Sequence, residues 1–534
     1  MKKILTAKYD CHGMDNGEII ETILNDRDIE NLQEFLHPSE NSLIPFEDMK
    51  NIEKAYEIID DGIMMGQKFL IFGDVDADGI SSAAIMVKYL EMSDANVSYT
   101  INQGKKHGVE NFDLSLLNDI DVMIIVDSLN NDPAIYKRIT DLGVQLVIFD
   151  HHIPQNELLD SDVPFVLVSS AVDYPNEDLS GAGVCLKYVL YADYMNLTDY
   201  AEKLWVYGAI GICADMCSMA SPENRYIVSK GLSDFKNPIV QKMIGNYQFN
   251  TESIQFSIAP LVNAAMRMSE NEKALDLFIS DDEDEIDELV KDLKQCKENQ
   301  NKIVDSLIDE LFKQGDEQLD RKCMFFFLKD IDADIGGLLG NRLLSVYQKP
   351  LFVLKDKGNQ WAGSMRAVGV ENMLEIANKT GLCLCQGHPL AAGVFIDKNK
   401  FEEFKIVIED VLKDVEFKTE IEADIEISPK QVNEQLIKQL TALNRISGNG
   451  WPSIKVLIRT DNYEVGTFST KKHLKIIDDS GVILVKWNDM SWKTMQNDKE
   501  FIGIGTLSSP YYGRNKFLQL TMNDYTMVDK EEEL

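Results

Sequence analysis

Basic side chains are scarce in this 534-residue sequence. It holds 53 lysine and arginine residues against 89 aspartate and glutamate residues, so its formal net charge is −36 at pH 7. A protein that grips long nucleic acid over a wide surface presents a basic face to the phosphates, and this composition excludes that class. Any contact with nucleic acid must therefore be local. Part of the acidic excess lies in solvated stretches such as residues 281–285.

Cysteine is also sparse, and long apolar runs are absent. The eight cysteines include no Cys-x-x-Cys pair, which argues against a disulfide-stapled scaffold. Residues 1–7 begin like a signal peptide, but Lys8, Asp10 and His12 interrupt the apolar stretch. No uninterrupted apolar run is long enough to span a bilayer. We therefore expect a cytoplasmic protein with reduced thiols and no membrane partner.

The residues that are present predict an α/β fold with several domains, because 534 residues exceed what one hydrophobic core serves. Between residues 68 and 220, short apolar runs alternate with longer mixed segments, which is typical of βαβ units on a parallel sheet. The strands are expected at residues 69–72, 97–101, 122–126, 144–149 and 165–168.

The remainder of the chain changes character twice. Residues 272–314 carry apolar side chains three, four or seven positions apart in a charged background, which predicts one long amphipathic helix. Residues 322–415 form a second α/β segment with strands at 323–328 and 350–354. From about residue 420 onward, short alternating apolar runs predict a small β-barrel.

Three carboxylates follow the first predicted strand in the stretch Gly73-Asp-Val-Asp-Ala-Asp-Gly79. Alternate residues of an extended chain point the same way, so Asp74 and Asp76 can converge on one point. Such convergence is unfavourable unless a cation neutralises it. An acidic surface turn remains the alternative for this stretch alone. An EF-hand fits poorly, because no glutamate stands at the twelfth position.

Further acidic and imidazole side chains stand where other apolar runs stop. Asp127 follows residues 122–126, Asp150-His151-His152 follows residues 147–149, and Asp215 closes the run 211–215. The carboxyl ends of parallel strands share one edge of a sheet, where ligands bind. Oxygen ligands with one or two imidazoles suit Mn²⁺ or Mg²⁺ better than a structural zinc.

These four motifs resemble those of the DHH phosphoesterases, which are named for the triplet that stands here at residues 150–152. The resemblance implies a metal centre of two Mn²⁺ or Mg²⁺ ions with Asp127 as the bridging ligand. The implied metal ligands are Asp74, Asp76, Asp127, His151 and Asp215, and the implied catalytic residues that support or complete the site are Asp78 and His152.

Other motifs resemble the RecJ-type exonucleases in particular. Residues 180–184 (Ser-Gly-Ala-Gly-Val) look like a family helix start that packs near the site, and residues 258–267 look like a family motif that ends in Arg267. Residues 335–337, 363–366 and 387–393 look like the DHHA1 substrate domain. The C-terminal part resembles an OB-fold in which cations and aromatics interleave. The implied substrate-binding residues are Arg267, Ser364, Arg366, His388, Lys472 and Arg514, with Lys471 beside them.

The resemblance divides the chain into a DHH catalytic domain with an N-terminal extension (1–270), a connecting helix (271–320), a DHHA1 substrate-binding domain (321–418) and an OB-fold nucleic-acid-binding domain (419–534). It implies hydrolysis of single-stranded DNA from the 5′ end, with release of 5′-mononucleotides. Two alternatives stay open, namely a phosphodiesterase for short oligonucleotides or cyclic dinucleotides, and a non-catalytic scaffold of DNA replication or repair. A single-strand-binding or helicase partner is not readable from the sequence.

Overall fold

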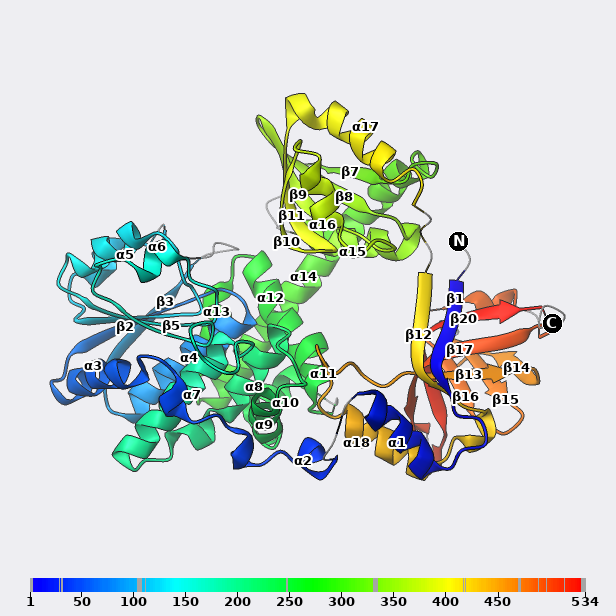
Figure 1. The fold of residues 1–534 in the computed structure, drawn as a ribbon, viewed down its shortest axis with the longest axis horizontal. Helices are drawn as coiled ribbons and strands as arrows, with labels where there is room; N and C mark the ends of the chain where they lie inside the picture. The colour runs from blue at the N-terminus through cyan, green and yellow to red at the C-terminus, as the bar shows by residue number, and fades with distance from the viewer. Residues whose placement is uncertain are drawn as a thin grey trace. The chain divides into compact units, whose positions relative to one another are not determined.

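The computed structural model describes residues 3–27, 29, 32–102, 108–110, 112–245, 248–329, 335–415, 417, 419–468, 472–487, 489–495, 497–512 and 514–529. Lys471 lies outside these residues. The chain divides into two compact units (Figure 1). The first comprises Asn31–Gln300 and Arg445–Pro452, and the second comprises Met1–Glu30, Asn301–Asn444 and Ser453–Leu534. No helix among the described residues is long and apolar enough to cross a membrane.

The first unit is built on a parallel five-stranded sheet in the order β3-β2-β4-β5-β6, as the apolar runs predict. The strands are β2 (Lys68–Gly73), β3 (Asn96–Ile101), β4 (Val122–Val126), β5 (Gln145–Asp150) and β6 (Val166–Ser169). Strands β2, β4 and β5 are almost wholly buried, because helices cover both faces of a parallel sheet.

The helices of the first unit pack on the two faces of this sheet. In Figure 1, α5 and α6 lie over one face, where Tyr136 and Leu158 join the alternate strand residues Phe72 and Ile125 in one core. Helices α4 and α7 lie over the other face, where the ring of Tyr188 packs 4.9 Å from that of Phe149. The helices before α8 are α2 (Leu32–Leu36), α3 (Ile52–Met64), α4 (Ala77–Met92), α5 (Pro133–Thr140), α6 (Asn156–Leu159) and α7 (Gly181–Asn196).

A run of short helices completes the first unit and leads into α14. These are α8 (Trp205–Ala214), α9 (Pro222–Gly231), α10 (Pro238–Ile244), α11 (Thr251–Ser253), a π-helical turn (Ile254–Ile258), α12 (Ala259–Arg267) and α13 (Asn271–Ile279).

The prediction of a single helix over residues 272–314 was wrong for the part before residue 283. The chain forms α13, breaks, and forms α14 (Glu283–Asp316). The break has a capping cause, because the side chain of Asp282 accepts hydrogen bonds from the backbone N–H groups of Asp284 and Glu285 at 2.9 and 3.0 Å. An aspartate in that position starts a new helix.

The second α/β segment has a five-stranded sheet in the order β10-β11-β9-β8-β7, in which only β7 and β8 pair in parallel. Both strands predicted for this segment are present. The elements are β7 (Met324–Leu328), α15 (Gly336–Tyr347), β8 (Leu351–Lys357), β9 (Gln360–Arg366), α16 (Met373–Lys379), β10 (Leu384–His388), β11 (Ala391–Asp397) and α17 (Phe401–Val411).

The C-terminal part of the second unit forms an eight-stranded sheet in the order β1-β12-β13-β17-β20-β16-β15-β14. Its closure into an OB-fold barrel stays a prediction. The strands and helices are β1 (Lys3–Asp10), α1 (Asn16–Asp26), β12 (Thr419–Glu426), α18 (Glu434–Asn444), β13 (Val456–Thr460), β14 (Tyr463–Gly466), β15 (Leu474–Asp478), β16 (Ile483–Lys486), β17 (Glu500–Ser508), β18 (Tyr511–Tyr512), β19 (Asn515–Lys516) and β20 (Gln519–Val528).

The N-terminal strand corrects the expected domain boundaries. Residues 1–270 were expected to form one domain, but β1 pairs in parallel with β12, from Lys3 opposite Thr419 to Asp10 opposite Glu426. The physical reason is that β1 finds its backbone partners and its core there, since Leu5 packs against Leu457 and Ile504. Conversely, residues 445–452, expected in the last domain, belong to the first unit.

Candidate metal centre

The carboxyl edge of the parallel sheet gathers the acidic residues. β3 pairs with one edge of β2, and the next strand of the sheet, β4, pairs with the opposite edge of β2. The strand order therefore reverses between β2 and β4. Such a switch point leaves a crevice at the carboxyl ends of the strands, where ligands bind in open α/β sheets. Asp74 follows β2, Asp127 follows β4 and Asp150 ends β5, so all three stand at this edge.

Asp127 occupies this crevice with an unusual backbone. Its φ is 54°, in the left-handed region that residues other than glycine seldom adopt. Its N–H donates to the carbonyl of Phe149 at 2.9 Å, and the residue is 2% exposed. Within the described part of the chain, its Oδ1 accepts no hydrogen bond and lies 3.1 Å from Nε2 of His151. Strain of this kind persists where the surroundings impose it, and it clusters at functional sites.

The loop after β2 turns its carboxylates inward by capping helices. Oδ1 of Asp76 accepts the N–H groups of Asp78 and Gly79, each at 3.0 Å, and so begins α4. Asp78 is fully buried, and its two oxygens accept the N–H groups of Gly181 at 2.8 Å and Ala182 at 3.1 Å. Asp78 therefore fixes the start of α7 against the start of α4, as expected for a helix start that packs near the site.

Asp150 arranges the two histidines that follow it. Its Oδ1 accepts the N–H groups of His151 and His152 at 2.7 Å each, and its Oδ2 accepts the N–H of Leu129 at 2.7 Å. The same Oδ1 lies 2.8 Å from Nδ1 of His152. Asp150 is therefore a positioning residue whose oxygens are already engaged.

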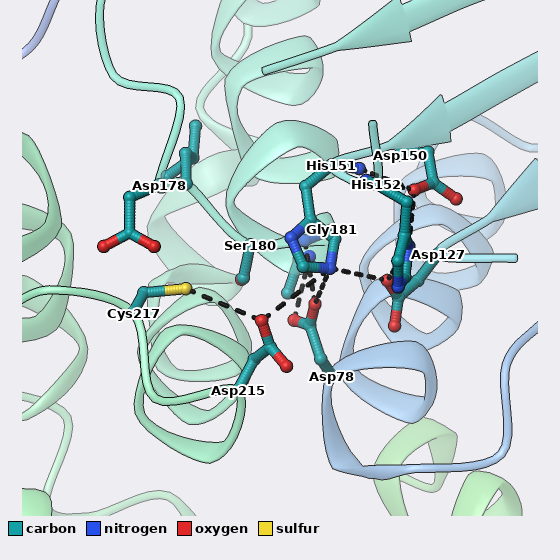
Figure 2. Close-up of polar contacts among 12 residues, drawn as sticks. Asp78, Asp127, Asp150, His151, His152, Asp178, Ser180, Gly181, Asp215 and Cys217 are labelled. Atoms are coloured by element: carbon teal, nitrogen blue, oxygen red, sulfur yellow. Dashed lines mark hydrogen bonds and ion pairs between the residues drawn. The ribbon is translucent and has the colours of Figure 1, made fainter. Parts of the chain in front are cut away.

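His151 points into the middle of the acidic group (Figure 2). Its Nε2 lies 3.1 Å from Asp127, 3.7 Å from Asp215 and 3.8 Å from Asp78. His152 is more exposed, and its Nδ1 lies 3.8 Å from Oδ1 of Asp127. One imidazole thus faces three carboxylates that come from three different segments of the chain.

Two glycines allow this close approach. A Cβ atom on Gly181 would lie 2.8 Å from Cβ of Asp127, and one on Gly211 would lie 2.1 Å from Oδ1 of Asp78. Both distances are shorter than real Cβ contacts, so any side chain at either position would displace a carboxylate. Asp127, Asp78 and Asp215 can lie close together because the positions of α7 and α8 that face Asp127 and Asp78 are the glycines 181 and 211.

Burial makes this group electrostatically unfavourable in the absence of a cation. It raises the pKa of Asp78 to about 7 and that of Asp127 well above its ordinary value, and the neighbouring carboxylates add to both effects. Burial also raises the pKa of Asp215. The hydrogen bond to Asp150 raises the pKa of His152 to about 9. Burial opposes ionisation of Asp150 too, but the bond and charge of His152 outweigh it and lower the pKa.

A divalent cation fits this arrangement. Among the residues that the structure describes, three groups of side chains each bring their ligand atoms within 4.8 Å of one another. They are Asp74, Asp76 and Asp127; Asp78, His151 and Asp215; and Asp127, His151 and His152. Buried carboxylates whose pKa values are raised by one another are stabilised in the charged form by a nearby positive ion. Carboxylate oxygens with few imidazoles suit Mn²⁺ or Mg²⁺.

The expected substrate-binding residues divide between the two units. Arg267 ends α12 in the first unit, where its Nη1 donates to the carbonyl of Asn263 at 3.2 Å. In the second unit, Ser364 and Arg366 lie on β9, and His388 ends β10. The register places Ala391 of β11 opposite both Arg366 and His388, so these two side chains stand in one row across the sheet.

The start of α15 lies beside this row. A Cβ atom on Gly337 would be 2.6 Å from Nη2 of Arg366, and one on Gly336 would be 3.5 Å from Oγ of Ser364. Nε of Arg366 donates to Oδ1 of Asn341 at 2.8 Å, which holds the guanidinium in place. A helix N-terminus beside an arginine and a hydroxyl is suited to an anion.

The C-terminal sheet carries an aromatic cluster. Trp487 is 43% exposed, stacks on Phe468 with ring centroids 5.6 Å apart, and meets His473 at 4.8 Å. Lys475 lies 5.5 Å from the ring of Phe468. Lys472 and Arg514 are exposed. This cluster is a surface on which bases could stack.

Sequence reasoning missed two kinds of contributor. Asp150 was read only as part of the triplet, and nothing in its sequence position shows that its oxygens would be used by backbone N–H groups. The N–H groups of Gly181 and Ala182 were also missed as partners of Asp78. Their signal was available, because a serine followed by glycines starts a helix whose first N–H groups lack partners within it.

Comparison with known proteins places this arrangement in a class. Residues 68–212 match the sequence model of the DHH family, N-terminal domain, so the first unit contains a DHH domain. The chain is also similar to the putative SPbeta prophage-derived single-strand DNA-specific exonuclease YorK of Bacillus subtilis, at 27% identity over 463 residues that cover 80% of each chain. It is 26% identical to the single-stranded-DNA-specific exonuclease RecJ of the same organism, over 77% of this chain and 54% of RecJ.

The same likeness is found among solved structures. The crystal structure of RecJ in complex with Mn²⁺ from Thermus thermophilus matches 98% of this chain and 79% of that chain, with a TM-score of 0.80 and 22% sequence identity. The fold of this chain is therefore that of RecJ, and the expected resemblance to RecJ-type exonucleases is confirmed.

Proposed function

We propose that this chain is a metal-dependent exonuclease that hydrolyses single-stranded DNA from the 5′ end and releases 5′-mononucleotides. The observation that carries the proposal is the convergence of Asp78, Asp127 and Asp215 on Nε2 of His151 at the switch point of the sheet. The similarity to relatives named as single-strand-specific exonucleases supports the substrate class.

The proposed ligands of two Mn²⁺ or Mg²⁺ ions are Asp74, Asp76, Asp127, His151 and Asp215, with Asp127 in contact with both. Asp127 belongs to two of the groups that could hold an ion, one with Asp74 and Asp76 and one with the histidines. Bound ions of this kind lower the pKa of water and neutralise charge on a phosphoryl group. We propose Asp78 as the residue that keeps α4 and α7 in register around them.

His152 is held in a fixed orientation beside the proposed metal ligands. Its Nδ1 is held by Asp150 at 2.8 Å, and this bond raises the pKa of His152 to about 9. The protonated ring would carry a second N–H at Nε2 that can donate to a phosphate oxygen. We therefore propose that His152 stabilises the negative charge that develops during hydrolysis.

The second unit would select and hold the strand. Ser364, Arg366, His388 and the start of α15 form the proposed site for a terminal phosphate. Arg267, in the first unit, is proposed as a separate phosphate contact of the strand. The C-terminal sheet, as an OB-fold, would bind the strand through the aromatic cluster with Lys472 and Arg514 nearby. Stacking tolerates any base, and a few cations suffice for a strand bound locally, which agrees with the net charge of −36.

The cytoplasm is the proposed location. All eight cysteines are free thiols, and seven of them are buried. Thiols persist unpaired in a reducing compartment.

One electrophoresis experiment tests the proposal. Single strands of DNA and of RNA, labelled at the 5′ or the 3′ end, are incubated with Mn²⁺, Mg²⁺ or EDTA. We expect the 5′ label to be released first as a mononucleotide, from DNA, and only with metal. Cleavage confined to dinucleotides would favour a phosphodiesterase for short substrates, and binding without cleavage would favour a scaffold.

A further inference from the structure

The loop that follows Asp215 is held by a segment from far along the sequence. Asp215 directly follows α8 as its C-cap residue, and Met216 after it has a φ of 59°. The chain then passes through Ser218 and Met219 to α9. Residues 445–452, which we call the clasp, belong to the same unit as this loop.

Both backbone groups of Met219 are bound by the clasp and its neighbour Arg225. The N–H of Met219 donates to the carbonyl of Asn449 at 2.7 Å, and its carbonyl accepts Nη1 of Arg225 at 3.2 Å. Met219 is 1% exposed, and a Cβ atom on Gly448 would lie 2.9 Å from its Cγ. The clasp therefore fixes the position of the loop at Met219, a few residues after the proposed metal ligand Asp215.

Arg225 is an unusual side chain for this purpose. It is 3% exposed, and within the described part of the chain no carboxylate pairs with it. Its guanidinium donates instead to the carbonyls of Phe35, Met219 and Ile446. It stacks 3.5 Å from the ring centroid of Phe35, which itself packs 4.4 Å from that of Trp451. A buried cation whose only acceptors are carbonyls binds the three segments that supply them to one another.

The geometry points to the clasp as the positioning device of the metal centre: through Arg225 and Met219, residues 445–452 hold the loop that aims Asp215 at the proposed metal ions. Asp215 would then bind the metal ion more weakly when the clasp is displaced. Along the chain, helix α18 precedes the clasp, and strand β13 of the C-terminal sheet follows it. The inference rests on the proposed metal centre and adds to it a dependence on this distant segment.

Gly450 offers a small and specific way to disturb the clasp. Its φ is +68°, and a Cβ atom there would lie 2.1 Å from Oγ and 3.2 Å from Cβ of Ser218. The Ser218 hydroxyl can rotate away, but its Cβ moves only with the loop. Gly143 is the matched control, because it belongs to the same unit and has a φ of +85°, yet a Cβ atom there would meet nothing within 4 Å.

The test measures Mn²⁺ binding to the full chain by calorimetric titration, beside far-ultraviolet circular dichroism as a check of folding. We expect Gly450→Ala to weaken one class of Mn²⁺ site by about tenfold or more, as displacement of a ligand's support does, and Gly143→Ala to leave binding unchanged. In an Asp215→Asn background, Gly450→Ala should cause no further loss, because the ligand it displaces is already gone.

Other outcomes separate this inference from the proposed function. Equal Mn²⁺ affinity in the wild type and the Gly450→Ala variant would overturn the role of the clasp but not the metal centre. The same conclusion would follow if Gly450→Ala weakened Mn²⁺ binding as much in the Asp215→Asn background as in the wild type. A wild type that binds no Mn²⁺ would overturn the metal centre and the clasp together. If Gly450→Ala fails to fold, Trp451→Phe, which keeps an aromatic ring beside Phe35, is judged by the same criteria.

Discussion

At the scale of single residues, Asp127 combines a left-handed backbone with a buried carboxylate whose pKa is raised. Either feature alone destabilises a folded chain, so their coincidence at the end of β4 calls for a compensating ligand. Asparagine tolerates the same backbone region and has the same shape as aspartate. The substitution Asp127→Asn therefore removes the charge of this side chain and keeps its shape and backbone conformation.

Asp127→Asn should abolish hydrolysis while leaving the fold intact. If Asp127 contacts both ions, loss of its charge removes several kcal/mol of stabilisation, which corresponds to roughly three orders of magnitude in rate. In EDTA the variant should unfold at a higher temperature than the wild type, because it no longer buries a carboxylate among others. Hydrolysis of a single strand and thermal unfolding are the two measurements. Wild-type turnover after stripping and re-addition of metal would contradict the bridging role.

The titrating residues of the centre predict how the metal-free chain depends on pH. The pKa values of Asp78, Asp127 and Asp215 are raised in the folded chain, so the folded state binds more protons than the unfolded state above about pH 4. Its stability should therefore fall as pH rises from about 4 through 7, where Asp78 ionises, and the raised pKa of His152 extends this fall toward pH 9.

Unfolding by urea in EDTA, repeated across this pH range, measures the effect. Saturating Mn²⁺ should flatten the dependence, because the cation stabilises the charged carboxylates that the pH rise produces. A metal-free chain whose stability rises between pH 5 and 7 would contradict the assignment.

At the scale of elements, the sequence predicted what depends on local pattern. Apolar runs located the strands of the parallel sheet to within a residue or two. The clearest were β2, β4 and β5, because a strand buried on both faces is apolar throughout. The break before α14 was missed, since the capping by Asp282 looks like one more acid in a charged helix. The candidate site was predicted as residues but not as contacts: nothing local shows that Asp78 would accept N–H groups from residues 181 and 182.

β9 and α15 supply the residues that we expect to select the 5′ end of a DNA strand. Nη2 of Arg366 lies toward the N-terminal glycines of α15, beside Ser364, in a setting suited to an anion. A terminal phosphate carries more charge than an internal diester, and an arginine can hold it through two parallel hydrogen bonds. Arg366→Ala should therefore reduce the preference for a 5′-phosphorylated over a 5′-hydroxyl strand by about one to two decades.

Arg342→Ala is the matched control for Arg366. Arg342 lies on the same helix as Gly337 but forms an ion pair with Asp305, so its loss should leave end preference unchanged. The measurement compares cleavage of 5′-phosphate, 5′-hydroxyl and 3′-phosphate strands at fixed salt. A wild type indifferent to the 5′ group, or an Arg366→Ala variant with full preference, would show that this row of residues does not select the end.

At the scale of the whole molecule, the chain is not divided in the order of its sequence. If the domains followed one another in sequence order, a chain ending near residue 420 would keep hydrolysis of dinucleotides and lose affinity for long strands. The structure changes that expectation. Strand β1 pairs with β12, the side chain of Gln431 donates to the carbonyl of Cys11 at 2.8 Å, and Arg225 donates to the carbonyl of Ile446 at 3.0 Å. Such a truncation removes all three partners.

Two truncations separate these contributions. A chain of residues 1–418 lacks β12 and the clasp, whereas a chain of residues 1–454 keeps both and lacks β13 to β20. In the shorter chain, the buried side chain of Arg225 loses the carbonyl of Ile446 as an acceptor. A buried polar group without a partner lowers the free energy of unfolding by about 1–3 kcal/mol, and a charged group lowers it further. We expect residues 1–418 to unfold at a lower temperature, bind Mn²⁺ more weakly and lose dinucleotide hydrolysis, and residues 1–454 to retain more of each property. Equal Mn²⁺ affinity and equal hydrolysis in the two chains would mean that the catalytic unit needs nothing from beyond residue 418.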